Sequence, residues 1–323
     1  MQIFKKIAKW TGLVILGIII VFALLVGGLT TFHHIALAAE RGRLDNPGQL
    51  VTVNGNRMNV YIRGEQQGDN PTLVFISGAG TASPIYNFMP LLNRLPDYRL
   101  VIVERFGYGY SDIVRNLDRD LSSILSDTRQ ALTLANIELE NLILVPHSMG
   151  GLEALYWANK YPTEIRAIVG LDMAVPDSYN YLDFNSERSQ IMMARRLKFF
   201  GLSRIIGNTQ GTADLTSHQR RQQNRLGHRN FVNPSLIAEG LALLDNIEIL
   251  RESIREYGTP DVNMLLFTSH GNDIDHNWLP TQRAFVAERA SRTLVELNVG
   301  HYVHQYEAEA IATRVIEFIG GLS

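Results

Sequence analysis

The hydrophobic positions along the chain follow two patterns, which meet near residue 45. Before it lies an uncharged run, residues 11–39, whose most apolar part is 13–29. After it, short apolar runs alternate with segments of helical periodicity. The runs that indicate strands are residues 72–76, 100–103, 142–145, 167–171, 264–267 and 294–297. Strands that are apolar at every position are typical of a parallel sheet buried on both faces.

Helical periodicity fills the segments between these strands, and a hairpin precedes them. The predicted helices are residues 86–95, 121–135, 152–160, 281–290 and 308–319. Alternating residues at 51–53 and 59–62 flank Asn54-Gly55, a dipeptide that favours a two-residue hairpin turn. Helices between parallel strands form right-handed crossovers. Residues 51–323 are therefore predicted to form one α/β domain, with a mostly parallel central sheet of about eight strands flanked by helices.

One long segment of this domain has no strand pattern. It lies between residues 171 and 262 and contains helical patterns at 186–200 and 234–257. A gap of this length inside an alternating pattern predicts a helical lid, about residues 174–258, inserted after the sixth strand. Residues 182–230 contain nine basic and three acidic side chains. Such an excess suits either a solvated helical surface or a basic lid that rests on anionic headgroups.

The N-terminal pattern predicts a membrane anchor. Residues 1–10 contain three lysines, residues 11–32 are long enough to span a bilayer, and residues 33–50 form a linker. Ala36-Leu37-Ala38 has the form of a signal-peptidase site, but the apolar core is longer than a secretory signal requires. We therefore predict an uncleaved single-pass anchor. Because basic residues also follow the span, the charge bias that favours a cytoplasmic N-terminus, with the rest of the chain outside, is small.

Composition narrows the possible classes of function. The chain has 323 residues, of which 46% are hydrophobic, and it has no cysteine and a formal net charge of −2. This composition excludes a disordered protein, a disulfide framework, a thiolate metal site and a cysteine nucleophile. A net charge near zero gives no basis for a nucleic-acid partner. The oligomeric state is not determined by these features.

The candidate chemistry begins at Pro146-His147-Ser148-Met149-Gly150-Gly151, which joins the strand at 142–145 to a helix. Small residues around a serine let a strand and a helix pack around a strained turn that exposes the hydroxyl group. Ser148 is therefore the candidate nucleophile. A serine that only caps a helix is the alternative, but a cap does not require the glycine pair.

With this motif the chain resembles the α/β-hydrolase family, from about residue 54 to the C-terminus. Ser77-Gly78-Ala79-Gly80 is similar to the family's His-Gly-x loop, with serine in place of histidine. The resemblance implies that the backbone amides of Ala79 and Met149 form an oxyanion hole. Residues 104–112 are similar to the family's Asp-x-x-Gly-x-Gly-x-Ser segment, which is structural.

The resemblance also implies a base and an acid. Gly300-His301 is similar to the segment that precedes the family's final helix, so His301 is the expected general base. His304 lies three residues further on and suits a packing role or a lid contact. For the acid we favour Asp172, which follows the strand at 167–171 as in dehalogenase-like members, and Asp273 is the second candidate. The structural alternatives are a helix cap for Asp172 and an Asx turn for Asp273.

These residues predict a serine hydrolase that cleaves an ester or related acyl bond through an acyl-enzyme intermediate. Dehalogenases use an aspartate where Ser148 stands. The expected partner is a small-molecule or lipid-like acyl substrate, and we expect no cofactor and no metal at the site. Two alternatives stay open: a catalytically inactive protein that uses the fold for binding, and a C–C hydrolase or perhydrolase with the same triad.

Overall fold

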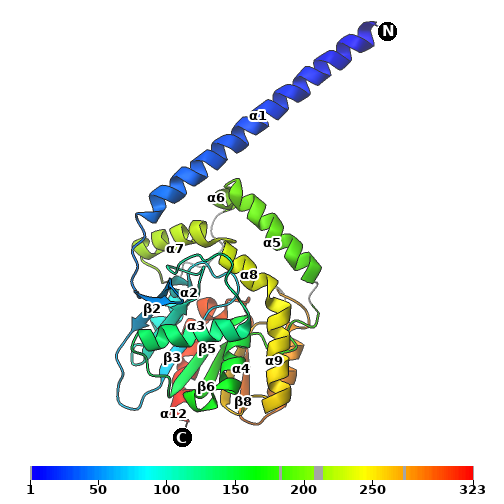
Figure 1. Cartoon of the computed structure of the whole chain (residues 1–323). Helices are drawn as coiled ribbons and strands as arrows, with labels where there is room; N and C mark the ends of the chain where they lie inside the picture. The colour runs from blue at the N-terminus through cyan, green and yellow to red at the C-terminus, as the bar shows by residue number, and fades with distance from the viewer. Residues whose placement is uncertain (1, 182–183, 207–213, 272–273, 323) are drawn as a thin grey trace.

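The computed structural model describes residues 2–181, 184–206, 214–271 and 274–322. Its centre is an eight-stranded sheet in the order β1-β2-β4-β3-β5-β6-β7-β8 (Figure 1). The strands are β1 (Gln49–Val53), β2 (Asn56–Arg63), β3 (Thr72–Ile76), β4 (Arg99–Glu104), β5 (Leu142–Pro146), β6 (Ile165–Leu171), β7 (Asn263–Thr268) and β8 (Arg292–Glu296). β1 and β2 are antiparallel, and the other six are parallel to one another. The predicted mostly parallel sheet is confirmed.

The N-terminal hairpin forms at the predicted turn. Asn54 and Gly55 have φ angles of 49° and 75°, and Val53 pairs with Asn56. Two consecutive residues with positive φ are typical of a type I′ turn, whose twist matches that of the strands it joins. This hairpin gives the parallel sheet its antiparallel edge.

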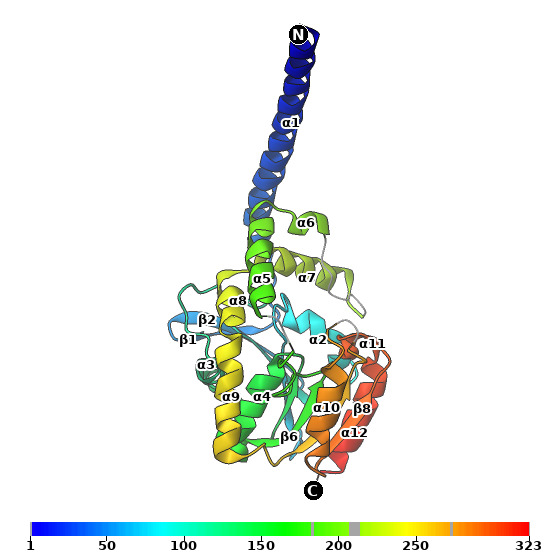
Figure 2. The same ribbon diagram turned by 90° about the vertical axis from the view of Figure 1, so that its right-hand side faces the viewer.

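Helices cover both faces of the sheet (Figures 1 and 2). They are α2 (Pro84–Leu92), α3 (Leu121–Leu134), α4 (Gly150–Lys160), η1 (Pro162–Glu164), α10 (Trp278–Ala287), α11 (Val303–Tyr306) and α12 (Ala308–Gly320). Val74 belongs to the core cluster that includes Trp157 of α4, whereas the next residue, Phe75, packs on Phe88 of α2 in a second cluster. Successive residues of a strand thus contribute to opposite cores, which explains why consecutive residues in the middle of the strands are apolar.

The lid region folds as helices between β6 and β7. Its described helices are α5 (Phe184–Phe199), α6 (Ser203–Ile206), α7 (Ser217–Asn230), α8 (Pro234–Leu241) and α9 (Leu243–Tyr257). α7 begins at a capping box formed by Thr216 and Gln219. The helical pattern at 234–257 is interrupted at Ala242, where α8 ends and α9 begins. Gly240 weakens helix propensity there, and a Cβ atom at this position would lie 3.0 Å from Ile191 Cδ1 of α5.

Several predicted elements differ from the structure in their boundaries. The helix predicted at 86–95 is α2, Pro84–Leu92, and the helix predicted at 281–290 is α10, Trp278–Ala287. The last strand begins at Arg292, two residues before the predicted 294–297. Arg292 is buried because its guanidinium lies 3.9 Å from the centre of the Phe285 ring and donates to the Phe285 carbonyl. An arginine at a strand end has no apolar signal in the sequence, so the pattern alone places the start too late.

The N-terminal segment forms one continuous helix, α1 (Gln2–Arg41), which projects away from the domain (Figures 1 and 2). It joins the lysine-rich start, the apolar run and the first part of the predicted linker. The helix is long and apolar enough to cross a membrane, a test that signal sequences also pass, and its most apolar window is not buried against the domain. Its one buried residue among those described is His33.

Candidate active site

Ser148 lies at a sharp turn between β5 and α4. Its φ angle is 51°, a left-handed conformation that is costly for a residue with a side chain. A Cβ atom on Gly150 would lie 2.7 Å from the Ile76 carbonyl oxygen, and one on Gly151 would lie 2.2 Å from that of Ala174. Glycine is therefore required at both positions for the helix to start this close to the neighbouring strands. The turn leaves Ser148 half-buried between buried residues.

Asp172 and His301 meet beside this turn, although 129 residues separate them. Asp172 is fully buried at the end of β6, and its Oδ2 lies 2.6 Å from His301 Nδ1. Its other oxygen, Oδ1, accepts hydrogen bonds from the Ser269 amide and the Trp278 indole, each at 2.8 Å, and from the Thr268 hydroxyl at 3.1 Å. The carboxylate is thus satisfied on both oxygens.

The protonation of Asp172 follows from these contacts. Burial raises the pKa of the Asp172 carboxyl group. The hydrogen bond and charge of His301, together with the hydrogen bonds from Ser269 and Trp278, lower it by more, so the pKa lies below its ordinary value. Asp172 is therefore ionised at neutral pH. A carboxylate against Nδ1 fixes the proton of His301 on that nitrogen and leaves Nε2 as the basic atom.

His147, which precedes Ser148, connects the turn to His301. The two imidazole rings are 4.6 Å apart, and His147 Nε2 lies 3.2 Å from the His301 carbonyl oxygen. Burial, with the neighbouring His301 and His304, lowers the pKa of His147 far below its ordinary value, so this ring is neutral. The structure thus brings the turn at Ser148, the end of β6 and the segment after β8 together at one end of the sheet.

His304 has a packing role. Its side chain is fully buried, and Nε2 lies 2.7 Å from Oδ1 of Asn87 in α2. Burial lowers the pKa of His304 to about 3. It stacks on Phe88 at 5.0 Å and is therefore part of the contact between α11 and α2.

The loop of residues 77–80 lies directly against Ser148. A Cβ atom on Gly78 would come within 2.7 Å of the Ser148 Cβ. Within the described chain, the amides of Ala79 and Met149 donate no hydrogen bond to another protein group. An oxyanion is stabilised by amide donors that have no other partner.

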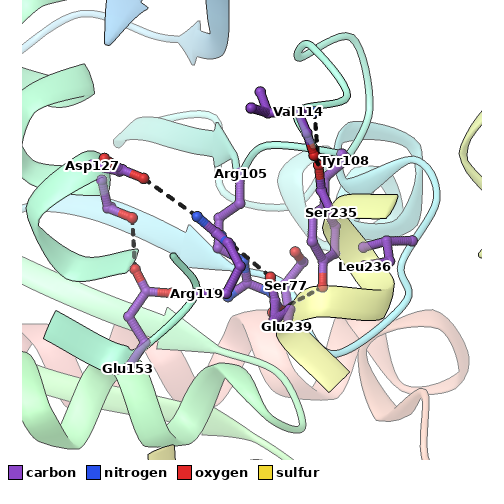
Figure 3. A network of polar contacts seen from close by, with 12 residues as sticks. Ser77, Arg105, Tyr108, Val114, Arg119, Asp127, Glu153, Ser235, Leu236 and Glu239 are labelled. Atoms are coloured by element: carbon purple, nitrogen blue, oxygen red, sulfur yellow. Dashed lines mark hydrogen bonds and ion pairs between the residues drawn. The ribbon is translucent and has the colours of Figure 1, made fainter. Parts of the chain in front are cut away.

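A buried polar network holds this loop (Figure 3). Arg105 donates to the Ser77 carbonyl at 2.9 Å and forms ion pairs with Glu153 at 2.9 Å and Glu239 at 3.2 Å. The Tyr108 hydroxyl accepts from the Gly80 amide at 3.3 Å and donates to Glu239 at 2.7 Å. Both ends of the loop are therefore tied to Glu239, which belongs to lid helix α8.

The same network extends toward α3. Arg119 pairs with Glu239 and with Asp127 of α3, each at 3.3 Å, and the Thr128 hydroxyl donates to Glu153 at 2.7 Å. All of these charged side chains are buried. Buried charges persist only when they are paired and hydrogen-bonded, so the lid and the loop depend on one another through this cluster.

Residues 104–112 form a second buried arrangement beside it. Glu104 accepts hydrogen bonds from Asn59 Nδ2 at 3.0 Å and from the Tyr110 amide at 2.7 Å, and burial raises its pKa to about 7. A Cβ atom on Gly109 would lie 1.9 Å from this carboxyl group. Arg229 of α7 donates to the Gly109 carbonyl at 2.7 Å, so the lid also covers this segment.

The other candidate acid, Asp273, lies outside the described residues. Asp275 in the same loop accepts a hydrogen bond from the Asn277 amide at 2.7 Å, as a turn residue does. In the part of the chain that the structure describes, no group of three or more His, Asp or Glu side chains could hold a metal ion.

The sequence did not point to the three residues that bind Asp172 Oδ1. Thr268 and Ser269 follow directly after the apolar part of β7, and this small polar pair is the one signal that could have indicated them. Trp278 begins α10, and nothing in the sequence pattern connects it to Asp172.

Comparisons with known proteins identify the family and the fold. Residues 71–307 match the family model described as alpha/beta hydrolase fold. An uncharacterised protein of Bacillus subtilis strain 168, YbdG, is 29% identical over 301 residues, covering 89% of this chain and 90% of its own. The pimeloyl-[acyl-carrier protein] methyl ester esterase of Shewanella woodyi is 26% identical over 196 residues, covering 57% of this chain and 71% of its own. The solved structure of an esterase from Exiguobacterium antarcticum superposes with a TM-score of 0.64 at 19% identity, covering 85% of this chain and all of its own.

Proposed function

Because the chain belongs to the α/β-hydrolase family, we propose that this hydrolase uses Ser148 as its nucleophile and cleaves an ester or related acyl bond. The observation that carries the proposal is the 2.6 Å contact between Asp172 and His301 beside the strained turn at Ser148. A nucleophile, a base and a group that orients the base are what acyl transfer requires.

In the proposed reaction, the Ser148 hydroxyl oxygen attacks the acyl carbonyl carbon while His301 Nε2 accepts its proton. The oxyanion of the tetrahedral intermediate accepts hydrogen bonds from the amides of Ala79 and Met149. The intermediate collapses when the leaving group departs with the proton from His301, and the acyl-enzyme remains. Water then attacks in the same way, and the carboxylic acid product is released. Asp172 stays ionised and stabilises the imidazolium at each proton transfer.

The identity of the nucleophile favours acyl chemistry. A serine forms an acyl-enzyme that water can hydrolyse. One relative that the chain resembles is named a methyl ester esterase. The lid helices cover the end of the sheet where Ser148 lies, so we infer that the acyl group binds between the lid and the sheet. A small-molecule or lipid-like acyl substrate suits this position.

We also propose that α1 is a retained membrane anchor, with the N-terminus in the cytoplasm and the hydrolase domain outside. Contacts after the apolar run support retention. Arg204 of α6 donates to His33 at 3.0 Å, and the His34 ring lies 5.6 Å from that of Phe199 in α5. Cleavage after Ala38 would remove both histidines from the lid.

The proposed triad is tested by labelling the full-length protein in detergent with a fluorophosphonate probe, which modifies an activated serine. The Ser148→Ala variant abolishes labelling. The His301→Ala and Asp172→Asn variants lower its rate by about 10³-fold or more, because the base is lost or loses its orientation. The Asp273→Asn variant is the matched control and keeps the wild-type rate. Far-UV circular dichroism establishes that each variant is folded.

Three results would contradict the proposal. Labelling that persists in Ser148→Ala places the nucleophile elsewhere. A folded wild-type protein that does not react indicates a binding protein with this fold. A larger loss in Asp273→Asn than in Asp172→Asn moves the acid to the loop after β7.

A further inference from the structure

Helix α5 has two faces of different character. The inner face, with Ile191, Ala194 and Leu197, is half-buried. The opposite face carries a stripe of large apolar side chains that are between 39% and 61% exposed: Met192, Met193, Phe199 and Phe200 at the helix end. Single exposed apolar residues are normal on a protein surface, but a stripe of this kind along one helix face marks an interaction surface.

The stripe also carries positive charge. α5 contains four basic residues and one acidic residue. Three of the basic side chains, Arg188, Arg195 and Arg196, are exposed, whereas Lys198 turns inward and donates to the Arg229 carbonyl at 2.9 Å. Apolar side chains flanked by arginines are typical of a helix that lies in the headgroup region of a bilayer.

The C-terminal end of α5 is attached to α1 just after the apolar run. The Arg204 guanidinium donates to both carboxylate oxygens of Glu40, at 2.9 and 2.8 Å, and to His33 at 3.0 Å. A Cβ atom on Gly201 would lie 2.7 Å from the His33 Cβ. The position of α5 along α1 is thus fixed at the level where the apolar part of α1 ends.

The direction of α5 fits a surface helix. In Figure 1, α5 runs crosswise to α1, and α8 lies on its domain side. The exposed stripe is opposite the face that Ile191 presents to Gly240 of α8. It is therefore turned toward the side from which α1 projects, which is the bilayer side if α1 spans a membrane.

We infer that the outer face of α5 is a second membrane contact, which lies among the headgroups of the leaflet where α1 ends and binds anionic phospholipid. The inference rests on the proposed membrane anchor. Continuity of the stripe with α1, through the Phe199–His34 contact, and the arginines beside it identify a lipid surface as the occupant. Helices α5 and α6 of the lid are then held by the membrane as well as by the domain.

The test uses a property of this chain, the absence of cysteine. Single cysteines introduced by Met193→Cys, Glu252→Cys and Phe22→Cys are labelled with an environment-sensitive nitrobenzoxadiazole dye in the full-length protein. Each is reconstituted in nanodiscs of phosphatidylcholine, with or without an equal part of phosphatidylglycerol. Met193 is 61% exposed, and the side chain of Glu252 is 67% exposed, so the two positions are matched. Position 22 lies in the apolar run of α1 and reports on the anchor itself. The readout is quenching by lipids that carry a nitroxide near the headgroup for positions 193 and 252, and on the acyl chain for position 22.

The expected result is that the dye at position 193 is quenched more strongly than the dye at position 252, and more strongly with phosphatidylglycerol than without it. Replacing Arg195 and Arg196 by glutamate removes this lipid dependence.

Quenching by acyl-chain nitroxides at position 22, together with equal quenching at 193 and 252, overturns the inference and leaves the anchor intact. Absence of quenching at position 22 overturns the anchor and the inference with it. A blue shift at 193 without quenching by lipid identifies a protein occupant and also overturns the inference.

Discussion

The two halves of the lid are held in different ways. The inner half, α7 to α9, reaches the sheet with buried polar side chains: Arg229 donates to the Gly109 carbonyl, and Glu239 joins the network under the loop of residues 77–80. The outer half, α5 and α6, packs on α8 through Ile191 and is tied to α1 through Arg204. Both halves are helical and contain several arginines, so the presence of basic residues along the chain does not indicate which half is part of the core.

Burial decides the role of each charge. Arg229 and Arg196 are both lid arginines, but the first satisfies backbone carbonyls beneath the lid and the second is exposed on α5. Removing a buried charge leaves its partners unpaired in a low-dielectric interior, whereas removing an exposed one returns its partners to water. Buried lid charges should therefore be sensitive to single substitutions and exposed ones tolerant of them.

The largest effect is expected for Glu239→Ala. Arg105 and Arg119 would each lose an ion pair in a buried site, which lowers the free energy of unfolding by about 3–5 kcal/mol. Urea denaturation in detergent measures this loss. Glu252→Ala on α9, a matched exposed lid glutamate, leaves the free energy of unfolding nearly unchanged. Equal effects of the two substitutions would remove the distinction between buried and exposed lid charges.

The next effect is a pH dependence from Glu104, which the inner half of the lid covers. Burial raises its pKa from 4.5 to about 7, so the fold favours the protonated form. Its contribution to stability is complete below pH 4.5 and is lost as the pH rises through 7, a change on the order of 3 kcal/mol. We expect the stability of the wild type, relative to that of Glu104→Gln, to fall over this range. Parallel stability curves for the two proteins would contradict the assigned shift.

A smaller effect is expected where the outer half meets α1. Arg204→Gln removes the charged hydrogen bonds to Glu40 and lowers the free energy of unfolding by about 1–2 kcal/mol. A double-mutant cycle with Glu40→Gln isolates the pair and is expected to give a coupling of about 1 kcal/mol. Additive effects would mean that α1 and the lid are not coupled through this contact.

The smallest effect is expected on the exposed stripe of α5. Met193→Ala removes a side chain that is 61% exposed, and it should change the free energy of unfolding by less than about 0.5 kcal/mol. Thermal unfolding in detergent checks this value. A large loss of stability would show that the stripe is packed against the protein and is not available for lipid.

Most of the central sheet follows from apolar pattern alone. β3 has the predicted bounds, 72–76, because both of its faces are buried and the four residues after Thr72 are apolar. The hairpin turn at Asn54-Gly55 is equally local, since its positive φ angles suit these residues. The end of α8 at Leu241 and the early start of β8 at Arg292 are less local, because Gly240 lies against Ile191 of α5 and Arg292 lies against Phe285.

The candidate site also has a part that depends on local sequence and a part that depends on distant contacts. The turn at Ser148 is a local motif, because its glycines are needed wherever a strand, a tight turn and a helix pack together. The surroundings of Asp172 are different, since its four hydrogen-bond donors come from three separate segments: β7 with the residue after it, α10, and the loop before α11. The hydrophobic periodicity of the sequence does not predict which loops meet at the end of the sheet.

The sequence by itself determined the strands, the sharp turn that holds Ser148, the apolar helix at the N-terminus and the helical insertion after β6, because each depends on neighbours within a few residues. Only the tertiary structure decided which aspartate faces His301, which lid charges are buried, and where the lid meets α1. Those outcomes depend on contacts between segments more than a hundred residues apart, such as Asp172 with His301 and Glu40 with Arg204. Only the packing of the whole sheet and its lid brings such pairs within hydrogen-bonding distance.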